Sequence, residues 1–101
     1  MTYEELESNV IAWADARRIT MHSSANSQLM KTVSELGELA DATLKRDRDG
    51  IVDGVGDVLV TLIIYARLQR VSITECLASA YETIKDRTGH LTPEGVFVKD
   101  E

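Results

Sequence analysis

Several residue types are scarce in this chain of 101 residues, and each scarcity excludes something. A single proline and six glycines leave room for long, uninterrupted helices. Aromatic residues make up only 5% of the chain, so its core must be aliphatic. The lone Cys76 cannot form a disulfide within the chain and fits a reducing cytosol, which predicts a cytoplasmic protein.

Long apolar runs and excess positive charge are also missing. The longest apolar run, Val58–Ala66, is far shorter than the roughly 20 residues of a membrane-spanning helix, and residues 1–9 do not resemble a secretory signal. The formal net charge of −6 argues against a partner with a nucleic-acid backbone. A small polyphosphate remains an acceptable ligand, because metal ions can bridge acid to acid.

Apolar residues recur at helical spacing along most of the chain, while strand signals are weak everywhere. The pattern predicts four helices, at about Thr2–Arg17, Ser27–Lys45, Ile51–Leu68 and from Ser72 or Thr74 to Asp86. Thr2 and Glu5 form a capping-box signature. Residues 18–25 are expected to form a loop, residues 45–50 a charged turn, and residues 85–101 a turn-rich tail.

This pattern predicts one all-α domain over residues 1–101, built as an antiparallel four-helix bundle. From Val58 onward the third helix is apolar almost all the way round, so it must be covered on several sides. In so short a chain, another subunit could supply part of that cover.

Acidic residues recur at helical spacing on two neighbouring helices. Glu35 and Glu38 are three residues apart, and Asp53 and Asp57 are four apart. Glu38 and Asp57 are equally distant from the turn at residues 45–50, which places them at the same height, roughly 10 Å along each helix. Up to four carboxylates can then face one another, and such a cluster suits Mg²⁺ or Mn²⁺.

Two glycines accompany these acids, Gly37 between the glutamates and Gly56 before Asp57. Each destabilises a helix interior by about 1 kcal/mol relative to alanine. Close approach of the two backbones beside a metal site would compensate for this cost. The competing interpretation is a solvated acidic helix face, which is the usual meaning of acids at this spacing. On the residues alone the two interpretations are about equal.

The segments SELGELADA (Ser34–Ala42) and DGVGDVLVTLI (Asp53–Ile63) resemble the MazG-like branch of the all-α nucleoside triphosphate pyrophosphohydrolases. The resemblance extends over most of the chain. Four further segments also fit this family: WADARRI, QLMK, YETIKDRTGH and GVFVKDE. The end of the chain is similar to the short, single-domain versions often carried by bacteriophages.

This resemblance implies a four-helix fold that assembles as a homodimer or homotetramer. It also implies Mg²⁺-dependent hydrolysis of a nucleoside triphosphate to the monophosphate and pyrophosphate. In the family pattern, EExxE followed by ExxD, Glu35, Glu38 and Asp57 match the second glutamate, the third glutamate and the aspartate. Ser34 and Gly54 replace the remaining two acids, so Asp53 would have to act as a ligand from the position next to Gly54.

The expected mechanism follows from charge. Metal ions held by Glu35, Glu38, Asp57 and Asp53 would offset the charge that develops when water attacks the α-phosphorus, and would lower the pKa of that water. Glu35 or Glu38 is the expected general base, and the sequence does not choose between them.

Other residues are candidates for contacts with the nucleotide. Lys31, Lys85, Arg87 and Lys99 could bind phosphate, and Trp13 and Gln28 could contact the base. Four of them have an ordinary alternative: Lys31 could pair with Glu35, Lys85 and Arg87 could interact with a helix dipole, and Trp13 could lie in the core.

Two alternatives to an enzyme remain open at this point. One is a non-catalytic protein that binds nucleotide or metal, in which Ser34 and Gly54 mark lost catalysis. The other is a helical dimerisation module whose acidic stripe only keeps it in solution.

Overall fold

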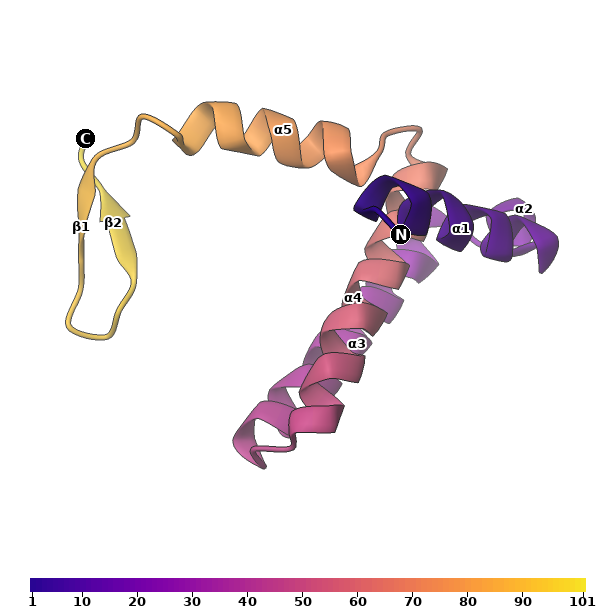
Figure 1. Ribbon diagram of the computed structural model, residues 1–101, viewed down its shortest axis with the longest axis horizontal. Coiled ribbons are helices and arrows are strands. Elements are labelled where there is room, and N and C mark those ends of the chain that lie inside the picture. The colour runs from indigo at the N-terminus through magenta and orange to yellow at the C-terminus, as the bar shows by residue number, and fades with distance from the viewer.

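Two long antiparallel helices carry the fold. In a computed structural model, which describes residues 1–101, α3 (Ala25–Leu44) and α4 (Arg48–Leu68) lie side by side and make the most extensive contact in the chain (Figure 1). The turn between them is short because Asp47 caps α4, accepting a hydrogen bond from the Gly50 N–H at 3.1 Å. The expected antiparallel pairing of these two helices is therefore present.

Three further helices complete the helical part of the chain. α1 (Tyr3–Ala16) and α2 (Ile19–His22) lie at the end of the α3–α4 pair that is remote from its turn, and α1 begins at the predicted capping box of Thr2 and Glu5. α5 (Ile73–Ile84) leaves the end of α4 and extends away from the other helices (Figure 1). The prediction of an all-α fold is confirmed.

Two local predictions were wrong. The expected loop at residues 18–25 contains α2 and the start of α3, whose cap is Ser24. The expected turn-rich tail contains a hairpin of β1 (Gly89–Leu91) and β2 (Phe97–Lys99), in which Leu91 pairs with Phe97. The tail was misread because its strands have only three residues each, too few for an alternating pattern to emerge.

Three helices end at an arginine with a left-handed backbone. Arg18, Arg46 and Arg70 have φ angles of 62°, 54° and 62°. Arg46 and Arg70 each come directly after the C-cap residue of a helix. In both places the N–H of the residue after the arginine donates a hydrogen bond to a carbonyl of the final helical turn. This geometry reverses the chain within a few residues and is usually adopted by glycine.

The chain exposes far more surface than a compact monomer of its size. Its accessible area is 7782 Å², whereas about 5,700 Å² is expected for a folded protein of this mass. Only 10 of 101 residues are buried, and the exposed apolar residues include Leu77, Tyr81 and Ile84 along α5. The single chain therefore leaves roughly 2,000 Å² more surface open than a folded monomer normally does.

None of the helices combines the length and the apolar character that crossing a membrane would require.

Candidate metal and nucleotide site

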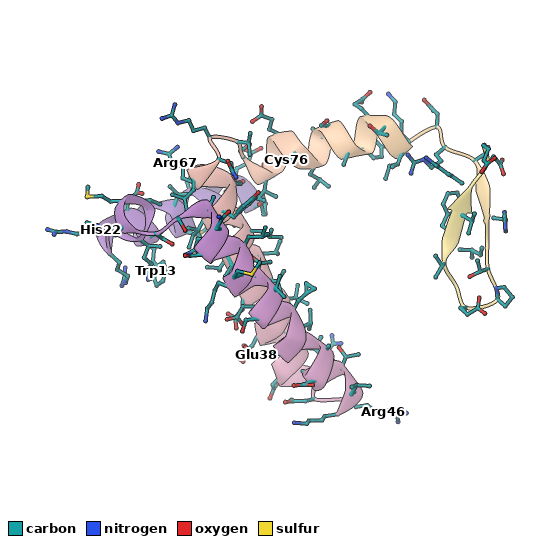
Figure 2. All side chains as sticks on the ribbon, turned by 180° about the vertical axis from the view of Figure 1, so that it is seen from behind. Trp13, His22, Glu38, Arg46, Arg67 and Cys76 are labelled. Atoms are coloured by element: carbon teal, nitrogen blue, oxygen red, sulfur yellow. The ribbon has the colours of Figure 1, made fainter.

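An acidic groove runs between α3 and α4. We use this name for the hollow lined by the charged residues Glu38, Asp41, Lys45, Asp47, Asp53 and Asp57 and by the small residues Ala42, Gly50 and Gly54. Lys45 is the only cation among these residues, so the groove carries a strong negative charge. Figure 2 shows Glu38 part-way along the α3–α4 pair, above the turn that holds Arg46.

The equal spacing of Glu38 and Asp57 from the turn brings both residues to the same groove, together with Asp53. Asp53 precedes Asp57 by one helical turn, so both project from one side of α4. Three of the four expected carboxylates thus line one cavity, which the sequence spacing anticipated. Asp41 and Asp47 were not selected from the sequence. Asp41 follows Glu38 at helical spacing, which could have identified it.

Glu35 occupies a different environment from the other three acids. It is only 8% exposed and lies against α4, and its Oε1 atom is 3.3 Å from the Lys31 ammonium group. Its Oε2 atom is buried and has no hydrogen-bond partner. Because a buried carboxylate oxygen without a partner is costly, a cation at this position would satisfy an unmet interaction.

Glu35 and Glu38 are electrostatically coupled. A hydrogen bond to Glu35 raises the pKa of Glu38, and the negative charges of Glu35 and Asp57 raise it further, while Lys31 lowers it. With both carboxylates ionised neither can donate, so Glu35 gains this bond only when Glu38 holds a proton. The pKa of Glu38 therefore depends on the charges of Glu35, on its own helix, and of Asp57, on α4.

The donor set fits a hard divalent cation, since it offers only carboxylate oxygens of which one is buried and unsatisfied. No group of three or more carboxylate, imidazole or thiol side chains is already gathered in the geometry of a metal site. Glu38, Asp53 and Asp57 are exposed, so their side chains are free to turn toward Glu35. A metal ion bound here would therefore need these side chains to move closer together.

The expected role of Gly37 and Gly56 was wrong. A side chain built at either position meets nothing within 4 Å, so neither glycine lets the two helices approach in this chain. Gly54 does. A Cβ atom there would lie 3.1 Å from Leu39 Cβ and 3.2 Å from Leu39 Cα. In this chain a side chain at position 54 would therefore press against the α3 backbone, while Asp53 beside it opens onto the groove.

A second hollow adjoins the acidic groove at the α1–α2 end. Its lining includes Trp13, Ile19, Gln28, Lys31, Glu35, Asp57, Val60 and Ile64. Asp57 is the one residue that lines both cavities. Trp13 is 45% exposed, so it does not lie in the core of this chain, and Arg17 covers one side of its ring at 4.6 Å from the ring centre.

The remaining cationic candidates lie elsewhere. Lys85 follows α5 and pairs with Glu82 at 2.9 Å, whereas Arg87 and Lys99 lie between α5 and the hairpin and in β2. This part of the chain extends away from the α3–α4 pair (Figure 1). Within one chain, the structure therefore brings Trp13, Gln28 and Lys31 to the carboxylates but not Lys85, Arg87 or Lys99.

Comparisons with known proteins agree with this architecture. Residues 23–92 match the model of the MazG nucleotide pyrophosphohydrolase domain. A protein of 18.2 kDa from the rep–hol intergenic region of Haemophilus phage HP1 is 33% identical over 64 residues, which are 63% of this chain. The matched segment spans 39% of the length of that relative.

The fold is also similar to a solved structure, a MazG-like pyrophosphohydrolase of cyanophage S-2L bound to dGDP and three catalytic Mn²⁺ ions per active site. The TM-score is 0.76, the sequences are 23% identical, and the match covers 100% of this chain and 95% of the other. The family model spans both acidic helices and most of the residues that line the two cavities. The chain belongs to the family of MazG nucleotide pyrophosphohydrolase domains.

Proposed function

We propose that residues 1–101 form a single-domain enzyme that hydrolyses a nucleoside or deoxynucleoside triphosphate to the monophosphate and pyrophosphate. The observation that carries this proposal is the buried, unpartnered Glu35 Oε2 atom beside an acidic groove that contains Glu38, Asp53 and Asp57. An unsatisfied carboxylate facing further acids is unfavourable unless a cation joins them. Family membership and the nucleotide-bound cyanophage relative support the same function.

Mg²⁺ is the proposed cofactor, with Mn²⁺ as a substitute, and the Mn²⁺ ions of the cyanophage relative support this choice. Glu35, Glu38, Asp53 and Asp57 would hold the ions. When bound, the ions supply positive charge against the phosphates and favour ionisation of the attacking water. Glu35 is the anchor of the set, because burial on α3 holds its side chain in one place.

The two glutamates have different proposed roles in proton transfer. Glu35 already pairs with Lys31, so its Oε1 atom is engaged by an ammonium group. Glu38 has no cationic partner within ion-pair distance, and its neighbours raise its pKa. We therefore assign Glu38 as the group that accepts the proton of the water attacking the α-phosphorus.

The second hollow is the proposed site for the nucleoside. It joins the acidic groove at Asp57, so a nucleotide can place its phosphates at the carboxylates and its base against Trp13 and Gln28. An indole face suits a base by stacking, and an amide can hydrogen-bond to a base edge. Lys31 lies between the two regions and would contact a phosphate oxygen while remaining close to Glu35.

A second copy of this chain is the proposed cover for its exposed apolar surface. The surface in excess of a compact monomer is roughly 2,000 Å², and stable homodimers commonly bury 2,000–5,000 Å² in total. A homodimer or homotetramer would satisfy this requirement. It would also allow the cations Lys85, Arg87 and Lys99 of one chain to reach the phosphates bound to the acidic groove of another, which they cannot do within one chain.

The same lone cysteine that argues against a disulfide framework favours a cytoplasmic location, where nucleoside triphosphates are available. This location is part of the proposal.

Activity can be tested with purified protein, Mg²⁺ and each triphosphate in turn, with pyrophosphate release as the signal. Reaction in oxygen-18 water identifies the atom attacked, because the label enters the monophosphate after attack at the α-phosphorus and the pyrophosphate after attack at the β-phosphorus. We expect label in the monophosphate only. If no modified or unmodified triphosphate is turned over, while a positive-control enzyme is active, the enzymatic proposal is wrong.

A matched pair of variants tests the site itself. We expect Glu38→Gln to abolish turnover without unfolding the chain, whereas Asp49→Asn, an equivalent change in the first turn of α4 and outside the acidic groove, keeps activity. Nucleotide binding without turnover in the wild-type protein would favour a non-catalytic binding protein. Self-association without nucleotide or metal binding would favour a helical dimerisation module.

A further inference from the structure

Glu7, in the middle of α1, is a buried acid that the proposed chemistry does not use. It is 8% exposed, and Glu35 is the only other acidic side chain buried to this extent. It lies on α1, outside both the acidic groove and the second hollow. A buried carboxylate is stable only where donors or cations compensate for lost hydration, so its partners indicate its role.

Those partners are the first residues of α5. Glu7 Oε1 accepts a hydrogen bond from the Ile73 N–H at 3.3 Å, and Oε2 accepts one from Thr74 Oγ1 at 3.3 Å. The first N–H groups of a helix have no partner within the helix, and they form the positive end of its dipole. Glu7 therefore supplies from α1 an acceptor and a negative charge at the positive end of α5.

α5 also has a cap of its own. Ser72 accepts a hydrogen bond from the Glu75 N–H, and Glu75 reaches back to the Ser72 N–H. Glu7 is consequently not needed to start the helix. What Glu7 adds is a link between two segments that lie 66 positions apart in the chain.

This link is important because α5 has little other support. It makes only a few contacts with α4, and both α5 and the hairpin beyond it extend away from the other helices (Figure 1). Near the link, burial raises the pKa of Tyr3, and the charge of Glu7 and a hydrogen bond to it raise it further, so Tyr3 adjoins the same carboxylate. Without Glu7, few interactions would hold α5 at its present angle to α1.

We infer that Glu7 is a positioning residue whose two hydrogen bonds to the start of α5 fix the direction in which α5 and the hairpin leave the α1–α4 body. In an assembly, this direction determines where a chain presents its apolar α5 stripe and Lys85, Arg87 and Lys99. The consequence for a neighbouring chain rests on the proposed function, whereas the direction itself does not.

The direction can be measured by pulsed electron paramagnetic resonance between two spin labels. Leu44→Cys places one label beside the α3–α4 turn, Glu94→Cys places the other in the hairpin turn, and Cys76→Ser removes the native thiol. Labelled chains are diluted into excess unlabelled chains, so that only distances within one chain contribute. The wild-type background should give one narrow distance distribution.

Glu7→Ala should broaden that distribution about twofold or more, because the start of α5 loses its link to α1. Glu75→Ala is the matched control, since it removes an acid from the cap of α5 and leaves the Glu7 link in place, and its distribution should stay narrow. A Glu7→Ala distribution as narrow as that of the wild type would overturn the inference. If Glu7→Ala does not fold, Thr74→Val decides: removal of one of the two bonds should broaden the distribution, and no broadening overturns the inference.

Binding and kinetics provide a second readout. Mg²⁺ affinity, measured calorimetrically on the protein alone, should be the same in Glu7→Ala and wild type, because the carboxylates lie on α3 and α4. KM for the triphosphate should rise several-fold in Glu7→Ala and stay unchanged in Glu4→Ala, an exposed acid of the same helix. If Glu7→Ala weakened Mg²⁺ binding by as large a factor as it raised KM, the substitution would have damaged the whole site, and a positioning role would be contradicted. Absence of turnover in the wild type would refute the proposed function but leave the distance measurement valid.

Discussion

Thr32 and Thr61 join α3 to α4 through a buried hydrogen bond of 2.8 Å between their hydroxyl oxygens. The Thr61 hydroxyl in turn donates a hydrogen bond to the Val58 carbonyl oxygen at 2.9 Å. Thr32 precedes Glu35 by three residues, and Thr61 follows Asp57 by four, so in this antiparallel pair the bond lies about one turn from the two acids. This hydrogen bond fixes the register of α3 against α4, and in that register Glu35 and Asp57 line the same hollow.

We expect Thr32→Val and Thr61→Val each to lower the free energy of unfolding by about 1 kcal/mol, because each removes a buried hydrogen bond with little change in volume. The double variant should lose less than the sum of the two, since both single variants remove the same bond. Urea denaturation of the four proteins measures this directly. Strict additivity would show that the two hydroxyls act independently.

Gly54 and Gly56 offer a comparison within one helix. Gly54→Ala should destabilise the chain by about 1–3 kcal/mol, because its new methyl group would press on Leu39 and separate α3 from α4. Gly56→Ala meets nothing within the chain, and alanine is the better helix former, so a gain of up to about 1 kcal/mol is expected. Thermal unfolding of both variants checks this contrast, which fails if they shift the melting temperature in the same direction.

The raised pKa of Glu38 predicts how stability depends on pH when no metal is present. A carboxyl whose pKa is higher in the folded than in the unfolded chain binds its proton more tightly when folded. Its contribution to stability is complete below the usual pKa of 4.5 and is lost as pH rises through the raised pKa. Urea midpoints of the wild-type protein, measured with a chelator present, should therefore fall as the pH rises from 4.5 through the raised pKa of Glu38. Glu38→Gln should lack this fall.

Two additions make this pH experiment decisive. Glu4→Gln, an exposed change of the same type, should keep the wild-type pH dependence. Mg²⁺ should reduce the loss at higher pH, because a cation offsets the repulsion among Glu35, Glu38 and Asp57. Identical pH profiles for Glu38→Gln and wild type would show that the coupling with Glu35 does not affect folding.

Self-association can be tested on the apolar stripe of α5. Leu77→Glu should shift the protein toward the monomer, because it places a charge among Leu77, Tyr81 and Ile84, which are exposed in the single chain. Ser79→Glu, on another side of the same helix, should leave the oligomeric state unchanged. Light scattering coupled to size-exclusion chromatography provides the masses. A wild-type protein that is monomeric at all concentrations would refute the proposed assembly.

The long helices and the grouping of the acids could be predicted because both depend on local spacing. The apolar period located α1, α3 and α4 to within a few residues, and the turn at residues 45–47 brings Glu38, Asp53 and Asp57 to one groove. The capping box of Thr2 and Glu5 was equally visible, since it involves residues only three positions apart.

Features that depend on distant partners were not visible. The direction of α5 depends on Glu7, 66 positions away from Ile73, and no local pattern marks that pair. Likewise, Gly54 and Gly56 look alike in the sequence, and only the packing of Leu39 distinguishes them. Lys85 and Lys99 were grouped with the phosphate contacts on chemistry alone. They belong to the end of α5 and to β2, which extend away from the α3–α4 pair (Figure 1).

The three left-handed arginines have a consequence for how readily this protein tolerates change. Each residue other than glycine costs roughly 1–2 kcal/mol in that backbone conformation, and Arg18, Arg46 and Arg70 all adopt it. Glycine at these positions would release part of that energy. The chain thus holds an unused reserve of stability at its helix ends. Laboratory evolution could draw on it to tolerate costly substitutions around the carboxylates.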